Sequence, residues 1–252
     1  MNRLRFVDKT VVVTGAGSGM GRAAAIRLAS EGAKVMLLGR QAGILEDVCD
    51  EIKRAGGLSY VFPCDIRSEG QVKKTFMAVA SVFGQVDALF ANAGYLGAFK
   101  PLAEADIADF NEPLETNLKG TFLTIRHCLP LIKKGAILIN ASWTTGSVMP
   151  GAGIYAATKA ALLAIMRTLA VECGPRDIRV NAVSPGVILT PMAASALPEE
   201  TVNALASRSL LQRNGVPEDI SGTVAWLLSD DASYVTGQEI RVDGGFTLGG
   251  MR

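Results

Sequence analysis

The 252-residue sequence predicts a single α/β domain built on a doubly wound sheet of about seven parallel strands, with helices on both faces. Short β-branched or apolar runs alternate with helical segments through short links. Residues 33–38 are largely apolar, as expected for a strand buried on both faces of a parallel sheet. Hydrophobic residues make up 49% of the chain and charged residues 19%, which suits one large core and argues against extensive disorder.

The first expected strand, residues 10–13, leads into a glycine-rich turn and a helix over 22–30. The turn has the spacing T-G-x-x-x-G-x-G, and Met20 stands where G-x-G-x-x-G would need a small residue. Free N–H groups at the start of the helix and the helix dipole both face such a turn, so it suits a phosphate. We therefore expect a Rossmann-type dinucleotide site at this point.

The second strand ends in Gly39 and Arg40. An acidic residue about 20 residues after the glycines would bind the ribose 2′-hydroxyl of NAD. Arg40 instead supplies a guanidinium that can bind a 2′-phosphate. This favours NADP(H) over NAD(H), and the alternative is a solvated arginine that opens the next helix.

The later elements continue the alternation of strand and helix. Ligands of a doubly wound sheet bind beyond the carboxyl ends of its strands, so Asp65, Asn92 and Ser142, which follow three strands, are site candidates. The expected strands are 59–63, 86–90, 135–141, 178–183 and 239–242, and the expected helices are 43–55, 69–83, 104–131, 156–171 and 218–228.

Tyr155 and Lys159 open the helix expected over 156–171 and are four residues apart, so they share one face of it. A nearby cation favours the phenolate and should lower the pKa of Tyr155 toward working pH. The pair is therefore a candidate acid and base. An ordinary helix with a tyrosine and a lysine at this common spacing is the alternative.

Two other polar residues lie on the helix expected over 104–131. Asn117 is a poor helix former, because its amide competes for backbone hydrogen bonds, and its place inside the helix indicates a functional role. His127, the only histidine, is far in sequence from any strand end, and we expect it to be packed or exposed, not catalytic.

Composition limits the partners. A net charge of +1 gives no electrostatic case for nucleic acid or an anionic membrane. We expect no apolar run to reach the ~18–20 residues that a membrane helix requires, and the N-terminus lacks an apolar signal core, so we expect a cytoplasmic protein. The cysteines show no metal spacing, and we expect four reduced, buried thiols and no metal: Cys49, Cys64, Cys128 and Cys173.

The combined motifs resemble the short-chain dehydrogenase/reductase family, in its single-domain branch of about 250 residues. The resemblance is carried by the glycine turn, A-N-A-G at 91–94, N-x-x-G at 117–120, the interval of thirteen from Ser142 to Tyr155, and Y-x-x-x-K at 155–159. Later landmarks, among them S-P-G at 184–186 and V-D-G-G at 242–245, extend it over nearly the whole chain.

The resemblance implies roles for these residues. Tyr155 would be the general acid for ketone reduction, Lys159 would lower its pKa and hold the nicotinamide ribose, and Ser142 would bind the carbonyl oxygen. Asn117 would hold a water that links Lys159 to solvent. With Tyr155 and Lys159, the cofactor site would comprise Gly15, Ser18, Gly19, Met20, Gly21, Arg40, Asp65, Ile66, Asn92, Ala93, Gly94, Pro185, Gly186, Val187, Thr190 and Met192.

The serine motif departs from the family pattern. The family writes N-x-S-S-x-x-G, and this chain has N-A-S-W-T-T-G at 140–146. Counting from Asn140 places the catalytic position on Trp143, whereas counting back thirteen residues from Tyr155 places it on Ser142. Since tryptophan has no hydroxyl, we assign Ser142. For Trp143 and Tyr95, a pocket wall and plain core packing remain equally open.

We predict an NADP(H)-dependent reductase of a ketone or secondary alcohol, most simply a homotetramer as in the family. One alternative is an NAD-dependent dehydrogenase of a sugar or other secondary alcohol, and another is a non-catalytic cofactor-sensing protein on the same scaffold. A substrate lid is expected over about residues 190–212. Its many alanines and leucines leave an acyl-carrier thioester, a hydroxysteroid, a cyclic ketone and a polyol open as substrates.

Overall fold

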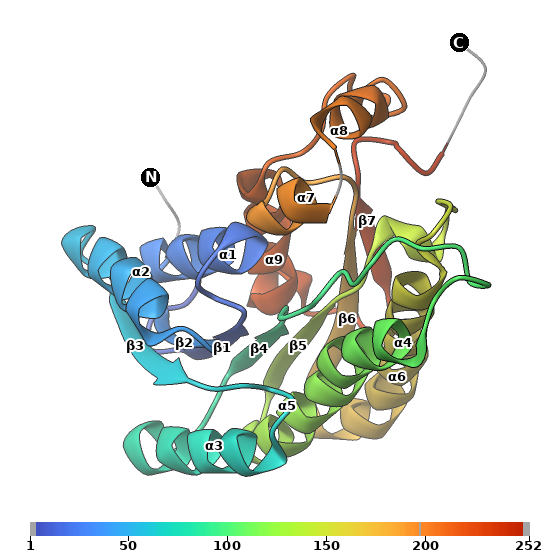
Figure 1. Ribbon diagram of the computed structural model, residues 1–252. Helices are drawn as coiled ribbons and strands as arrows, with labels where there is room; N and C mark the ends of the chain where they lie inside the picture. Colours follow the sequence, from blue (N-terminus) through green and yellow to red (C-terminus); the bar gives the residue numbers. More distant parts are fainter. Residues whose placement is uncertain (1–3, 197, 249–252) are drawn as a thin grey trace.

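The computed structural model describes residues 4–196 and 198–248 and confirms the predicted sheet. Seven parallel strands are ordered β3-β2-β1-β4-β5-β6-β7 (Figure 1). The strand order reverses between β1 and β4, which is the point where doubly wound sheets bind ligands. The strands are β1 (Thr10–Thr14), β2 (Lys34–Gly39), β3 (Leu58–Pro63), β4 (Ala88–Ala91), β5 (Gly135–Asn140), β6 (Ile178–Pro185) and β7 (Glu239–Val242).

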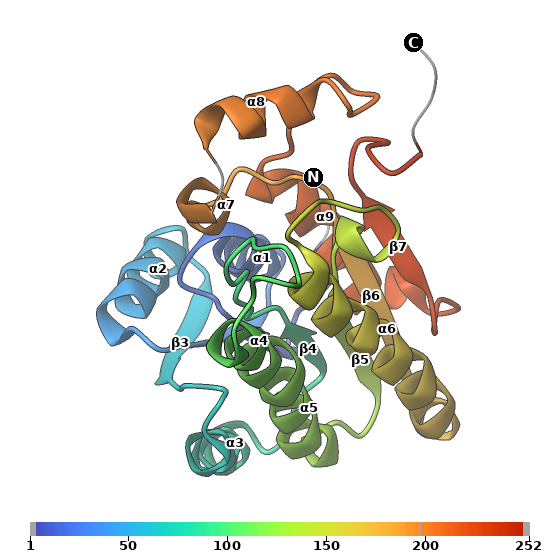
Figure 2. The same cartoon turned by 45° about the vertical axis from the view of Figure 1, so that its right-hand side comes forward.

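Helices cover both faces of this sheet (Figures 1 and 2). One face packs against α1 (Gly19–Ser30), α2 (Ala42–Arg54) and α9 (Pro217–Leu228) through one apolar cluster. The other face packs through a second cluster against α3 (Glu69–Phe83), α5 (Thr121–Cys128) and α6 (Gly153–Cys173). These two cores make the central strands rigid, so the residues at their carboxyl ends hold fixed positions. Cys49, Cys64, Cys128 and Cys173 are buried and free, as predicted.

The single helix predicted over 104–131 is interrupted. The structure has α4 (Ile107–Pro113), a π-helical turn (Leu114–Gly120), then α5 and a 3-10 turn (Leu129–Leu131). Asn117 lies in the π-helical turn, and its fully buried amide bonds to backbone outside the helix. Such turns occur often at functional sites.

The segment expected to form the lid contains two short helices, α7 (Pro191–Ala196) and α8 (Glu199–Ala206). Both lie beyond the carboxyl ends of the strands, outside the two helical layers (Figures 1 and 2). Val202 and Leu205 of α8 are buried, whereas Leu210 and Leu211 after it are exposed. The lid is thus held by few apolar contacts.

The expectation that no apolar run reaches membrane-spanning length was wrong for one helix. Within residues Gly153–Arg176 an 18-residue stretch has a mean hydropathy of 1.5, so this helix is long and apolar enough to cross a membrane by length and composition. The run contains α6, which packs on β6 and the core of the sheet. A core helix of a doubly wound fold passes the same test, so this is weak evidence for a membrane span.

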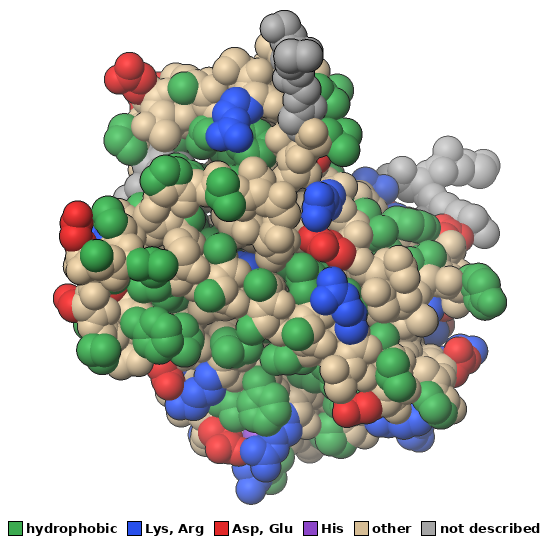
Figure 3. Space-filling model, turned by 90° about the vertical axis from the view of Figure 1, so that its right-hand side faces the viewer, with side chains coloured by type: hydrophobic (Ala, Val, Ile, Leu, Met, Phe, Trp, Pro, Cys, Tyr) green, Lys and Arg blue, Asp and Glu red, His purple; other side chains and the backbone are tan. Residues whose placement is uncertain are grey.

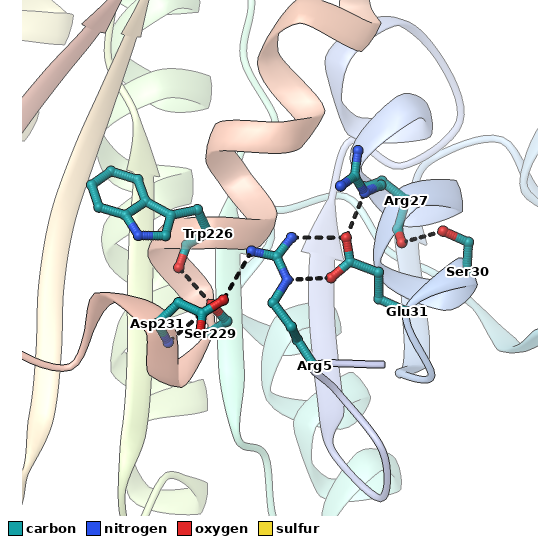
Figure 4. A network of polar contacts seen from close by, with 7 residues as sticks. All are labelled: Arg5, Arg27, Ser30, Glu31, Trp226, Ser229 and Asp231. Atoms are coloured by element: carbon teal, nitrogen blue, oxygen red, sulfur yellow. Dashed lines mark hydrogen bonds and ion pairs between the residues drawn. The ribbon is translucent and has the colours of Figure 1, made fainter. Parts of the chain in front are cut away.

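Charges on the face shown in Figure 3 are of both signs and are interspersed with apolar side chains. A separate buried network joins the N-terminal segment to the first helix (Figure 4). There Glu31 accepts hydrogen bonds from Arg5 at 2.5 and 2.8 Å and from Arg27 at 2.5 Å. The two guanidiniums hold the pKa of the buried Glu31 carboxyl below its usual value against the effect of burial.

Candidate active site

A cleft of about 510 Å³ opens at the carboxyl ends of the strands. It runs from the turn after β1 past the ends of β2, β3, β4 and β5 to α6 and the start of α7. Fourteen of the predicted site residues line it: Gly15, Ser18, Gly19, Met20, Arg40, Asp65, Ile66, Asn92, Ala93, Gly94, Tyr155, Lys159, Thr190 and Met192.

The glycine turn needs its glycines for two different reasons. Gly15 and Gly19 have φ of +66° and +52°, a backbone region that residues with a side chain rarely adopt. Gly21 does not line the cleft, and a Cβ there would lie 2.1 Å from the carbonyl oxygen of Gly15. Gly21 therefore permits close packing of α1 on the turn.

A chain of hydrogen bonds links the ends of β1, β4 and β5 behind the cleft. The Asn92 amide donates to the Thr14 carbonyl at 2.9 Å, and its oxygen accepts from the Asn140 amide at 3.0 Å. Lys159 Nζ donates to the backbone carbonyl of Asn140 at 2.8 Å. Because buried polar groups with several partners have one stable arrangement, this chain fixes the position of the lysine.

The pKa predicted for Tyr155 is wrong in direction for this structure. Burial raises the pKa of Tyr155 to about 12, against a smaller opposing effect of a hydrogen bond with Ser142. Lys159 Nζ lies 5.6 Å from the tyrosine ring centre and bonds to Asn140, and burial lowers its own pKa to about 8. In this structure burial of the phenol, and not the charge of Lys159, determines the direction of the Tyr155 pKa.

Ser142 lies at the tip of β5 and is 5% exposed. Its Oγ accepts hydrogen bonds from the backbone N–H of Thr144 at 3.2 Å and from the Thr144 hydroxyl at 3.0 Å. A serine hydroxyl has two lone pairs and one proton, so both acceptor positions are used and the proton remains for Tyr155 or a substrate oxygen. Trp143 points elsewhere and packs edge-on against Phe246 with ring centres 4.8 Å apart.

Asn117 is fully buried beside this group. Its side chain accepts from the backbone N–H of Tyr95 at 2.7 Å and donates to the Tyr95 carbonyl at 2.8 Å and to Thr158 at 3.0 Å. A Cβ on Gly94 would approach both Asn117 Oδ1 and Lys159 Nζ, at 3.3 and 3.6 Å, so these two polar atoms face the same small space. The asparagine is therefore held next to the lysine.

Arg40 is exposed at the far end of the cleft, near the Asp65 carboxylate. Asp65 pairs with Arg67, with the closest contact at 2.6 Å, and this hydrogen bonding holds the pKa of the Asp65 carboxyl below its usual value. Arg67 also lines the cleft. This end of the site therefore carries two guanidiniums around one carboxylate.

Some predicted residues lie elsewhere. Pro185 is buried at the end of β6, and Gly186 and Val187 line a smaller neighbouring cavity of about 150 Å³ beneath the lid. Tyr95 lines the main cleft and is 42% exposed. His127 lies 3.6 Å from Glu69 on α3 and is not in the cleft, as predicted.

Asn140 and Arg67 are among the residues that line the cleft and were not predicted as site residues. Every residue has a backbone carbonyl, so the residue type at position 140 gives no sign that this carbonyl accepts a hydrogen bond from Lys159. Arg67 could have been found, because it follows Asp65 by two residues at a strand end.

The residues present fit a dinucleotide. Two positive-φ glycines and the start of α1 leave a cradle with free N–H groups, and the buried Oδ1 of Asn140 has no hydrogen-bond partner among the described residues. The guanidiniums stand at the end of the cleft remote from Tyr155. These features suit a ligand that carries phosphates along the turn.

Comparisons with known proteins relate this chain to oxidoreductases. A family model described as enoyl-(acyl carrier protein) reductase matches residues 15–247. Glucose 1-dehydrogenase of Gluconobacter oxydans is 38% identical over 252 residues, which cover 98% of this chain and 94% of that protein. The 3-oxoacyl-[acyl-carrier-protein] reductase of Staphylococcus epidermidis is 37% identical over 248 residues, which cover 96% of this chain and all of that protein.

Two solved structures of oxidoreductases have nearly the same fold as this chain. The crystal structure of levodione reductase has a TM-score of 0.93 and 33% identity, covering 97% of this chain and 99% of that one. A 7α-hydroxysteroid dehydrogenase complexed with NADH and 7-oxo glycochenodeoxycholic acid has a TM-score of 0.92 and 34% identity, covering 97% and 96%. The chain belongs to the short-chain dehydrogenase/reductase family. It is an NAD(P)-dependent oxidoreductase that acts on CH–OH groups or the corresponding carbonyls.

Proposed function

We propose that the protein is a reversible NADP(H)-dependent reductase of a ketone, with Ser142, Tyr155 and Lys159 as its working residues. The observation that supports this most is the hydrogen bond between the Tyr155 hydroxyl on α6 and the Ser142 hydroxyl beyond the end of β5, with both acceptor positions of Ser142 used by Thr144. Bound NADP(H) supplies the hydride. The residues of the chain supply orientation, proton transfer and charge stabilisation.

Ser142 donates its free proton to the carbonyl oxygen as negative charge develops there. Its two acceptor positions are already used by Thr144, so the donor is oriented before the substrate arrives. Tyr155 protonates the same oxygen. The phenol carries its proton at neutral pH, which is the form that a reduction requires, and burial keeps it in this form by raising the pKa of Tyr155 to about 12.

Lys159 and Asn117 form the route by which Tyr155 regains a proton. Burial lowers the lysine pKa to about 8, close to working pH, so the amine gives up and takes a proton with little cost. Asn117 faces the same space next to Gly94 and would order a water there.

The preference for NADP(H) rests on Arg40. Its exposed side chain lines the cleft and forms no salt bridge with any residue in the described part of the chain, so it is available to a 2′-phosphate. Arg67 is held by Asp65 and adds positive potential at the same end.

The second candidate is an NAD-dependent dehydrogenase of a sugar. The similarity to glucose 1-dehydrogenase favours it, and so does the NADH in the 7α-hydroxysteroid dehydrogenase structure. Neither changes the roles of Ser142 and Tyr155, because the same residues serve oxidation in reverse.

A paired fluorescence titration with NADPH and NADH, followed by turnover on three probes, tests the proposal. The probes are levodione, acetoacetyl-CoA as a soluble 3-oxoacyl thioester, and D-glucose. The proposal predicts tighter NADPH binding and reduction of a ketone probe. Tighter NADH binding with oxidation of glucose would establish the second candidate instead. A cytoplasmic homotetramer remains our prediction for the state of the protein, to be checked by light scattering and cell fractionation.

A further inference from the structure

The turn that carries Ser142 is tied to an edge strand 94 positions away in the sequence. Ser142 begins a 3-10 turn (Trp143–Thr145). The Thr145 hydroxyl lies 2.8 Å from the Ser142 carbonyl oxygen and 3.0 Å from Oε1 of Glu239 on β7. One hydroxyl proton is thus shared between the backbone of the catalytic serine and a carboxylate.

Glu239 is itself held in place. Its side chain is 17% exposed, and the same Oε1 accepts from the fully buried Ser184 hydroxyl at 2.7 Å. Arg241 Nε lies 3.7 Å from it. A partly buried carboxylate with these partners is an anchor of fixed position.

The same strand also closes the far end of the turn. A Cβ on Gly146 would lie 2.5 Å from a guanidinium nitrogen of Arg241, so this side chain rests directly on the glycine that ends the turn. The turn is therefore bound to β7 at Thr145 and covered by β7 at Gly146. The residue before Ser142 is also attached to β6, through the ladder bond from the Ala141 N–H to the Val183 carbonyl.

We propose that Glu239 is a positioning residue for the reaction, which acts through Thr145 to hold Ser142 at the distance that carbonyl binding requires. This inference rests on the proposed role of Ser142. Glu239 touches no reacting atom. Its effect is to keep the Thr144 and Thr145 donors aligned on Ser142, because a shift of about 1 Å in a catalytic group costs on the order of a hundredfold in rate.

The first test is hydrogen exchange of residues 141–147, which needs no substrate. Glu239→Ala and Thr145→Val should each raise exchange in this segment by about tenfold, the factor expected for loss of a hydrogen bond to a charged group. Glu239→Gln keeps an acceptor oxygen and should leave exchange near the wild-type value. Glu31→Ala is the matched control, since it removes a buried carboxylate from a network that shares no residue with the turn (Figure 4).

The second test is turnover of the best ketone probe with NADPH. Glu239→Ala should lower kcat by about tenfold to a hundredfold with little change in KM or in the NADPH dissociation constant, and Glu239→Gln should restore most of it. In a Ser142→Ala background, Glu239→Ala should have no further effect on kcat. Thr145→Val serves the same comparison if Glu239→Ala does not fold.

Two outcomes would overturn the inference. One is unchanged exchange in residues 141–147 for both Glu239→Ala and Thr145→Val. The other is an equal loss of kcat from Glu239→Ala with and without Ser142. Full activity of Ser142→Ala would instead refute the proposed function, and hydrogen exchange would then still decide whether Glu239 holds the turn.

Discussion

The cleft has two sides that differ in how they are held. The polar wall comprises Asn92, Asn140, Tyr155 and Lys159, which line the cleft, and Asn117 and Ser142, which are buried and are not among its lining residues. Hydrogen bonds of 2.7–3.2 Å hold the three asparagines, Ser142 and Lys159 in place. The rim, formed by Tyr95, Pro191 and Met192, is exposed to solvent, with 42% exposure for Tyr95 and 40% for Met192. The contrast indicates that the wall determines the reaction and the rim determines the substrate.

The physical reason lies in burial. A buried polar group without partners is costly, so the wall has one arrangement that satisfies its donors and acceptors. The rim side chains are exposed to solvent, so a change in their arrangement leaves no buried polar group without partners. Tyr95 belongs to both sides, because its backbone holds Asn117 while its side chain lies at the rim. Substitutions can therefore test the two sides separately.

Tyr155→Phe removes one hydroxyl from the wall and should have the largest effect. Loss of the acid should lower kcat by about a thousandfold or more, while the dissociation constant for NADPH stays close to wild type. Single-turnover kinetics with the best ketone probe measures the rate, and fluorescence titration measures binding. Retention of most activity would sink the assignment of Tyr155.

Ser142→Ala should lower kcat by about a hundredfold to a thousandfold, the range for removal of one donor to a developing oxyanion. Thr144→Ala is the matched control for the register of the serine motif. It removes one of two donors to Ser142 and should have a much smaller effect. A larger loss from Thr144→Ala would move the catalytic hydroxyl to Thr144.

Arg40→Leu extends the comparison to the far end of the cleft. The variant should weaken NADPH binding by about 10- to 100-fold and leave NADH binding nearly unchanged, because only NADPH carries the 2′-phosphate. Calorimetric titration of both cofactors checks this. Equal losses for NADPH and NADH would refute the phosphate role.

Lys159 makes the polar wall sensitive to pH. Its folded pKa of about 8 lies below the ordinary lysine value of 10.5, so between these values the unfolded chain binds more protons and the free energy of unfolding rises with pH. The wild type should therefore gain up to about 1.4 kcal/mol per pH unit over Lys159→Met between pH 8 and 10. Denaturant unfolding at roughly pH 7.5, 8.5 and 9.5, which span the range in which Lys159 titrates, measures this gain in the free energy of unfolding. A constant difference would show that the amine is not buried as described.

Tyr95→Ala changes the rim alone and should have the smallest effect. The backbone bonds to Asn117 remain, so kcat should change little, whereas KM for a bulky ketone should shift by a few-fold. Steady-state kinetics with levodione and acetoacetyl-CoA gives both values. A loss confined to kcat would mean that the Tyr95 side chain belongs to the wall.

The sequence predicted the framework of this site well because strand ends depend on local patterns. Asp65, Asn92 and Ser142 follow β3, β4 and β5 as expected, and α3 and β7 have the predicted bounds. The alternation of apolar strands with helical segments and the glycine-rich turn are sufficient to predict these positions, because each pattern extends over only a few residues.

What the sequence did not predict depends on contacts between distant residues. The π-helical turn at Asn117 needs the Tyr95 backbone, and the direction of the Tyr155 pKa depends on how the folded chain buries the phenol. The tie from Thr145 to Glu239 spans 94 positions. None of these contacts leaves a pattern in residue spacing.

The most direct measurement is the ratio of kcat/KM for levodione to that for acetoacetyl-CoA in the wild type, Ser142→Ala and Tyr95→Ala. If the wall determines the reaction and the rim the substrate, Ser142→Ala lowers both values by the same factor and leaves the ratio unchanged, whereas Tyr95→Ala changes the ratio. A Ser142→Ala variant that altered the ratio more than Tyr95→Ala would contradict this division of the cleft.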